Sequence, residues 1–144
     1  MGRGYPDYGM SPVLPFGKVF AVQDALVTSV PASSYKEIYS ITAKGIIESG
    51  YLIIEGSGLP FFVTVNLYID GILMSPQSLS GLMARRITAE TTWPYYLTYY
   101  GDLGRYCVIS FREGCSYGVS WVLGLDNQDI VTLAVSGQIH YSHI

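Results

Sequence analysis

The stretch LPFFVTVNLYIDG, residues 59–71, is the part of the sequence that decides the fold class. Its apolar residues, Phe61, Val63, Val65, Leu67 and Ile69, alternate with Thr64, Asn66 and Tyr68. A period of two places one set on the inward face of a β-strand. Asp70-Gly71 then supplies the residue pair favoured in a type I′ hairpin turn, so we expect the chain to turn back at Ile72.

Further β-prone segments follow one another at short intervals on both sides of this strand. They are KVFAVQ (18–23), ALVTSV (25–30), YKEIYSITAKG (35–45), IIESGYLIIEG (46–56), PYYLTYYG (94–101), RYCVISFREG (105–114), SYGVSWVLGL (116–125) and DIVTLAVSGQIHYS (129–142). Ser49-Gly50 interrupts the fourth of them and indicates a bend or bulge. About eight or nine strands without long helical patterns between them predict an all-β fold, an antiparallel, jelly-roll-like β-sandwich. We assign residues 1–18 to an extended N-terminal arm and 19–144 to a single domain.

Residues 75–92 are the least regular part of the chain. The segment LSGLMARRITAE, residues 79–90, could form two helical turns. The β-branched residues Ile87, Thr88, Thr91 and Thr92 favour a strand instead. Both interpretations of residues 82–92 stay open.

The two cysteines, Cys107 and Cys115, flank a segment that we interpret as a hairpin with its turn near Glu113-Gly114. In that hairpin the two residues would lie ~17 Å apart along the strands. A disulfide cannot span such a distance. We therefore expect free thiols, with Cys107 a small buried residue.

The composition is poor in charge and rich in tyrosine. Hydrophobic residues make up 49% and charged residues 13% of the chain, with 13 Tyr and a net charge of −3. A typical globular protein has roughly 25% charged residues. Such a chain must cover its surface with uncharged side chains or with another copy of itself. Apart from Arg85-Arg86 the basic residues are dispersed, so we expect no nucleic-acid partner. No apolar run approaches the ~20 residues that span a bilayer, so we expect no membrane partner either.

The N-terminal residues 1–18 contain Pro6, Pro12 and Pro15, which exclude a regular helix. They also contain apolar and aromatic residues that are unusual in a solvated tail, of which Tyr5, Tyr8, Leu14 and Phe16 are the candidate contacts. The segment is either a loosely packed terminus or an extended arm that lies on the domain or on a neighbouring subunit.

The titratable residues form no recognisable catalytic or metal-binding motif. His140 falls on the polar face of the last expected strand and His143 near the end of the sequence, and H-x-x-H alone is a weak metal signal. Most of the acids stand in or beside expected turns, where their role is structural. Asp126-Asn127-Gln128-Asp129 could bind calcium but fits a polar β-turn better. We expect no enzymatic activity and no cofactor.

The most conspicuous group of residues is aromatic: Trp93, Tyr95, Tyr96, Tyr99 and Tyr100. In a regular strand Tyr95, Leu97 and Tyr99 share one face, and Tyr96, Thr98 and Tyr100 share the other. One face must join the core, and the other would present tyrosines outward. Those tyrosines could decorate an edge strand, form a subunit interface or stack on sugar rings.

Residues 30–74 also resemble a known group of proteins. The segments VPASSYKEIYSITAKGIIESGYLIIEG and VTVNLYIDGILM resemble small jelly-roll virion proteins of tailed phages and related viruses. In those proteins a strand ending in a Lys-Gly pair, a following Ser-Gly-Tyr-Leu strand and an Ile-Asp-Gly hairpin recur. The resemblance covers about a third of the chain. It implies a capsid, decoration or tail-associated protein in symmetric oligomers, and it carries no catalytic residues.

The sequence therefore supports two hypotheses. The first is a non-enzymatic virion structural protein, located in the virion, whose partners are copies of itself and other virion proteins. The alternative is an extracellular carbohydrate-binding module or lectin-like sandwich that uses a Tyr/Trp platform and binds a glycan.

Overall fold

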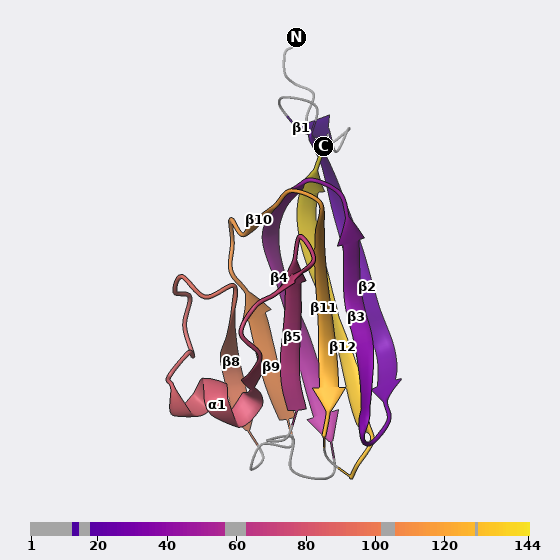
Figure 1. Ribbon diagram of the computed structural model, residues 1–144, viewed down its shortest axis with the longest axis vertical. Helices are drawn as coiled ribbons and strands as arrows, with labels where there is room; N and C mark the ends of the chain where they lie inside the picture. The colour runs from indigo at the N-terminus through magenta and orange to yellow at the C-terminus, as the bar shows by residue number, and fades with distance from the viewer. Residues whose placement is uncertain (1–12, 15–17, 57–62, 102–105, 129) are drawn as a thin grey trace.

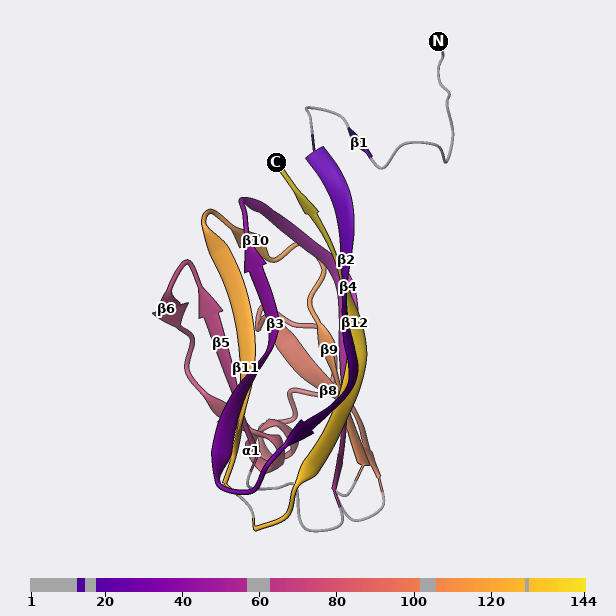
Figure 2. The same ribbon diagram turned by 90° about the vertical axis from the view of Figure 1, so that its right-hand side faces the viewer.

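The computed structural model describes residues 13–14, 18–56, 63–101, 106–128 and 130–144. Two antiparallel sheets pack face to face and contain most of these residues (Figures 1 and 2). Sheet A contains β1 (Val13–Leu14), β2 (Lys18–Val30), β4 (Gly45–Gly56), β8 (Tyr95–Gly101), β9 (Tyr106–Phe111), β10 (Ser116–Tyr117) and β12 (Leu133–His143). Sheet B contains β3 (Ser34–Thr42), β5 (Val63–Ile69), β6 (Ile72–Leu73), β7 (Gln77–Ser78) and β11 (Ser120–Asn127). The predicted all-β, antiparallel sandwich is confirmed.

The pairing of the eight longest strands in the described chain is largely that of a jelly roll. The first of them pairs with the last (β2 with β12), the second with the seventh (β3 with β11), and the third with the sixth (β4 with β9). Such nested pairs arise when one long antiparallel ribbon folds over into two sheets. The innermost pair departs from this scheme, because β8 pairs with β9 in sheet A and not with β5 in sheet B.

The core lies between the sheets, and aromatic residues join its two halves. Phe111 of sheet A meets Trp121 of sheet B edge to face, with ring centroids 5.3 Å apart, and also meets Tyr39 at 5.9 Å. The Tyr39 hydroxyl donates to the Tyr51 carbonyl in the opposite sheet at 2.9 Å. Burial raises the pKa of Tyr39, so this phenol stays protonated and retains its hydrogen bond. A buried polar group with a partner of this kind fixes the spacing of the two sheets.

The hairpin predicted at Asp70-Gly71 is confirmed. Asp70 and Gly71 both have positive φ, 55° and 79°, as a type I′ turn requires. The chain then returns as β6, with Ile72 opposite Ile69. Val63, Val65 and Leu67 are fully buried, as the alternation predicts, whereas Phe61 lies outside the described residues.

The prediction of a hairpin around Glu113-Gly114 is wrong. β9 and β10 both pair with β4, and they run along it in the same direction. Between them the Gly114 N–H donates to the Ile47 carbonyl and the Ile47 N–H donates to the Cys115 carbonyl, each at 2.8 Å. Gly114 has a φ of +87°, which allows residues 112–115 to bulge outward without reversing the chain. Cys107 and Cys115 are both buried, and no disulfide joins them.

The segment whose conformation stayed open contains one short helix. β7 leads into α1 (Leu79–Ala84), and the Ser78 hydroxyl caps it by accepting the Gly81 N–H at 2.9 Å. Leu79 and Leu82 point into the core. After the helix the Ile87 carbonyl accepts the Leu97 N–H at 2.9 Å, so this segment covers part of the β8 edge without forming a strand.

A bulge in β4 lies next to the predicted position. The register between β12 and β4 shifts between His140 and Tyr141, which leaves Glu48 as the extra residue directly before Ser49-Gly50. The bulge places Glu48 where its carboxylate accepts the Ser142 hydroxyl at 2.9 Å.

The two sheets are also joined along one margin of the sandwich by side chains that bind backbone. β3 is the terminal strand of sheet B, and β2 runs beside it in sheet A (Figure 1). The Gln23 amide donates to the Ser40 carbonyl at 2.9 Å and accepts the Ser40 N–H at 2.7 Å. The Lys36 ammonium donates to the Ser29 carbonyl at 3.4 Å. Gln23 thus satisfies both backbone groups of Ser40 as a neighbouring strand would.

In the part of the chain that the structure describes, no helix is long and apolar enough to cross a membrane.

Candidate functional site

The outer face of sheet A is covered by aromatic and aliphatic side chains where β4, β9 and β8 lie side by side. In these strands buried residues alternate with residues that point away from the core. Those that point away are Tyr51 and Ile53 in β4, Tyr106 and Val108 in β9, and Tyr96 and Tyr99 in β8. We call these six residues the tyrosine face.

The strand register brings the tyrosine face together from three distant parts of the chain. Tyr51, Ser110 and Tyr96 are paired in one row, and Ile53, Val108 and Tyr99 are paired in the next. Directly opposite residues in antiparallel strands have Cβ atoms about 5 Å apart, so neighbouring side chains can pack against one another. The six residues therefore form one continuous patch.

The tyrosine face is uncharged and consists of two exposed tyrosines and four half-buried residues. Tyr99 is 54% exposed and Tyr51 is 43% exposed. The rings of Tyr99 and Tyr106 meet edge to face, with centroids 5.6 Å apart and planes at 78°. Glu55, which is paired with Tyr106, places a charge at the margin. An aromatic centre with charge at its margin is the composition found in the cores of protein interfaces.

A bulge in β8 decides which tyrosines point outward, and it corrects the predicted faces. Leu97 is paired with Ile109 and Tyr99 with Val108, so Thr98 is the extra residue. Tyr99 consequently lies on the face opposite to Leu97, not on the same face. The Thr98 hydroxyl donates to the Val108 carbonyl at 3.1 Å and so holds the bulge in place.

The other aromatic residues singled out in this segment lie elsewhere. Tyr95 belongs to the core, where burial raises its pKa to about 12. Trp93 is half-buried against the core and meets Tyr95 edge to face, with centroids 6.0 Å apart. The Tyr100 side chain lies outside the described part of the structure. Of the five candidates, Tyr96 and Tyr99 join the tyrosine face.

Sequence reasoning missed Tyr51 and Tyr106 as members of the face. The alternation of residues along each strand was the available signal. Tyr51 and Ile53 alternate with buried Leu52 and Ile54, and Tyr106 and Val108 alternate with buried Cys107 and Ile109. What the sequence does not contain is the pairing of these strands, which brings the two tyrosines beside β8.

The proposed arm lies almost entirely outside the described residues. Tyr5, Tyr8 and Phe16 are among the residues whose placement is not described. Leu14 belongs to β1, where it is paired with Lys18, and Val13 is paired with Val19. The arm contacts stay a prediction.

A chain of hydrogen bonds borders the tyrosine face on the side of β12 and β2. Gln138, which is paired with Tyr51, donates to the Asp24 carboxylate at 2.7 Å. Its amide oxygen lies 2.6 Å from Nε2 of His140. His140 is therefore held on the polar outer side of β12, as predicted. Within the described residues no three His, Cys, Asp or Glu side chains are grouped so as to hold a metal ion.

Residues 126–128 of the oxygen-rich segment make structural contacts. Asn127 is fully buried, and its amide nitrogen donates to the carbonyls of Val30, Pro31 and Val131 at 3.1, 3.2 and 2.7 Å. The Asp126 carboxylate accepts the Gln128 amide at 3.3 Å. Asp129 lies outside the described residues.

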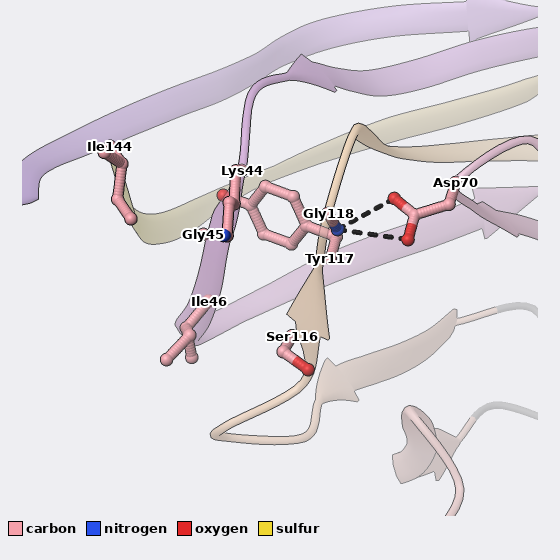
Figure 3. Close-up of a pocket in the computed structure, with 8 residues that line it drawn as sticks. All are labelled: Lys44, Gly45, Ile46, Asp70, Ser116, Tyr117, Gly118 and Ile144. Atoms are coloured by element: carbon pink, nitrogen blue, oxygen red, sulfur yellow. Dashed lines mark hydrogen bonds between the residues drawn. The ribbon is translucent and has the colours of Figure 1, made fainter.

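A cavity of about 370 Å³ opens at one end of the sandwich (Figure 3). It is lined by Lys44, Gly45, Ile46, Asp70, Ser116, Tyr117, Gly118 and Ile144. The Asp70 carboxylate accepts the N–H groups of Gly118, Val119 and Ser120 at 2.6 to 3.1 Å. These hydrogen bonds lower the pKa of Asp70. The carboxylate thereby ties the β5–β6 hairpin to the chain entering β11.

The Asp70 clamp predicts a pH-dependent contribution to stability. The pKa of Asp70 is lower in the folded than in the unfolded chain. The ionised carboxylate therefore adds to the free energy of unfolding at any pH above its pKa in the unfolded chain, and this stabilisation is lost as the pH falls through its pKa in the folded chain. The difference in free energy of unfolding between the wild type and Asp70→Asn is therefore expected to be constant above about pH 5 and to shrink below the ordinary pKa of 3.8. Urea titrations across this range measure it. Glu113→Gln is the control, and an Asp70→Asn difference that stays constant down to about pH 2 would contradict the clamp.

No protein-family model matches the chain, and no curated protein sequence matches it. Among solved structures, the chain is similar to a chain in the structure of infectious bursal disease virus Gx strain, with 11% sequence identity and a TM-score of 0.29. The alignment covers 97% of this chain and 45% of that chain.

Proposed function

We propose that this protein is a non-enzymatic structural subunit of a virion, in the capsid, in a decoration layer or associated with a tail, and that it assembles through its tyrosine face. The observation that carries the proposal is the face itself, an uncharged patch of four tyrosines and two aliphatic residues on the outer side of sheet A. Tyrosines bury a large area while losing little side-chain entropy, which suits a permanent contact.

The fold and the composition support the virion as the location by analogy. Jelly-roll sandwiches recur in viral capsid proteins and in lectins, although a fold alone does not specify a function. A chain with 13% charged residues covers its surface well when copies of it pack together. Its partners are then further copies of the chain and other virion proteins.

The arrangement of the rings favours a protein partner over a sugar on the tyrosine face. A sugar platform needs an aromatic ring lying flat and accessible, whereas the rings of Tyr99 and Tyr106 stand at 78° to each other. Tyr95 is buried, so it offers no surface to a glycan. Interlocking rings of this kind match the uneven surface of a second protein.

The proposal predicts that a single charge on the tyrosine face prevents assembly. Light scattering on the wild type, across a dilution series, is expected to show a closed oligomer well above the 15.8 kDa of one chain. Tyr99→Glu buries an unpaired charge in the contact and is expected to weaken association by ~100-fold or more. The variant should therefore run as a monomer at concentrations where the wild type is assembled.

The matched control is Tyr35→Glu on the outer face of sheet B, since Tyr35 is an exposed tyrosine like Tyr99, with 43% of its surface exposed against 54%. This variant should keep the mass of the wild type. Electron microscopy of the assembled material should show rings or shells of fixed diameter. A wild type that is monomeric at every concentration, or a Tyr99→Glu variant that assembles normally, would overturn the proposal.

A further inference from the structure

A groove on the outer face of sheet B is lined by polar and aromatic side chains. It has a volume of about 290 Å³ and is lined by Tyr35, Glu37, Tyr68, Gly71, Ser120 and Val122. This face is turned towards the viewer in Figure 1, where β11 lies between β3 and β5. The groove is therefore on the opposite side of the sandwich from the tyrosine face.

The floor of the groove is formed by small residues of the central strand. Ser120, Val122 and Gly124 occupy successive outward positions of β11. A Cβ atom at Gly124 would overlap the Tyr35 ring, so this ring lies directly against the β11 backbone. Glycine at position 124 thus gives the Tyr35 side chain its place, while Ser120 and Val122 form the open floor of the groove.

The walls rise from the two strands that flank β11. Tyr35 and Glu37 come from β3, and Tyr68 comes from β5, where it is paired with Val122. Tyr35 keeps 43% of its surface exposed although one side rests on the backbone. The groove therefore has aromatic walls on both sides, and each wall carries a hydroxyl.

The electrostatics of the groove are acidic. The pKa of Tyr35 is raised first by burial, then by Tyr68, Glu37 and Asp126. These groups act on one phenol because they lie close together. An anionic ligand would meet the Glu37 carboxylate in the groove, with Asp126 near the Tyr35 phenol, which disfavours its binding.

We propose that this groove binds one ring of a neutral pyranose sugar, as the terminal residue of a glycan. The C–H faces of a pyranose pack on tyrosine rings, the Glu37 carboxylate can accept hydrogen bonds from two sugar hydroxyls, and the Ser120 hydroxyl can donate or accept one more. The volume is at the lower limit of small-molecule sites, which suits a single ring. The Glu37 carboxylate disfavours sialylated and sulfated sugars. This inference does not rest on the proposed function, and assembly through the tyrosine face would leave the groove open.

The test is a chemical-shift titration of the ¹⁵N-labelled chain with methyl glucoside, methyl galactoside, methyl mannoside and N-acetylglucosamine. A ligand of this size is expected to bind with a Kd of roughly 1 mM. The shifts should involve the amides of Tyr35, Tyr68 and Val122. N-acetylneuraminic acid and choline are titrated in parallel as an anionic and a cationic probe.

Two variants remove separate parts of the groove. Tyr35→Ala takes away one wall, and Glu37→Gln takes away the charge while keeping the shape. Each is expected to weaken the bound sugar by ~10-fold. Tyr99→Ala, on the opposite side of the sandwich, should bind the sugar as the wild type does, and its spectrum also shows that the fold is intact.

Three outcomes would overturn the inference. The first is that no neutral sugar gives saturable shifts up to roughly twenty times the expected Kd. The second is that N-acetylneuraminic acid or choline binds more tightly than every neutral sugar. The third is that Tyr35→Ala binds the sugar with unchanged affinity. The two proposals fail separately. A monomeric wild type that binds sugar overturns only the structural role, and an assembled wild type that binds none overturns only the groove.

Discussion

Replacing Trp121 with alanine is expected to lower the free energy of unfolding by about 4 kcal/mol, the largest effect of any single substitution discussed for this chain. Trp121 is fully buried, and its ring meets Phe111 across the two sheets at 5.3 Å. Its removal leaves a cavity at the centre of the sandwich and breaks an aromatic contact that joins the sheets. A domain of this size has about 5–15 kcal/mol of stability in total, so the variant should be marginally folded.

The measurement is urea unfolding followed by far-UV circular dichroism, since the substitution removes a fluorophore. Trp93→Ala is the matched control, because Trp93 is the other tryptophan of the chain and is half-buried at the edge of the core. We expect it to cost about 1–2 kcal/mol. A Trp121→Ala variant that loses no more stability than Trp93→Ala would show that the aromatic contact between the sheets is not central to the fold.

Asn127→Ala is expected to lower the free energy of unfolding by about 3 kcal/mol, although Asn127 is a polar residue at the end of a strand. Its amide nitrogen donates to the carbonyls of Val30, Pro31 and Val131, and alanine would remove this donor from all three. The Pro31 carbonyl would keep the Ser34 hydroxyl as a donor. Asn127→Asp keeps the shape but replaces the donor with an acceptor. It should cost at least as much at pH 7, and part of the loss should be recovered in acid, where the carboxyl can donate.

Thermal and urea unfolding of both variants measures the effect, and Gln128→Ala provides the control. Gln128 is exposed and adjacent in sequence, and its substitution should change stability by less than about 0.5 kcal/mol. If Asn127→Asp were as stable as the wild type at neutral pH, the three hydrogen bonds would not be the reason that this residue is buried.

The parts of the fold that depend on neighbouring residues were predictable from the sequence. The alternation of Val63, Val65 and Leu67 identified β5, and Asp70-Gly71 identified its turn, because the φ angles of a type I′ turn restrict which residues can form it. The antiparallel sandwich then followed from repeated short strands without intervening helices.

The parts that depend on strands distant in sequence were not predictable. A glycine such as Gly114 is compatible with a hairpin turn and with a bulge. The chain forms a bulge here because Gly114 and Cys115 hydrogen-bond to Ile47 of β4. The bulge at Thr98 was not predictable either, because it is defined by the register between β8 and β9. That register leaves Thr98 without an opposite residue and turns Tyr99 outward. Tyr51 joins the tyrosine face for the same reason.

Gln23 has a consequence for how copies of this chain can meet. Unpaired backbone groups along a terminal strand are a template on which another molecule can add a strand, and repeated addition leads to open-ended fibres. By occupying both backbone groups of Ser40, the Gln23 side chain interrupts that template in the middle of β3. Strand addition along β3 is thereby blocked at Ser40, so two copies cannot join there into one continuous sheet.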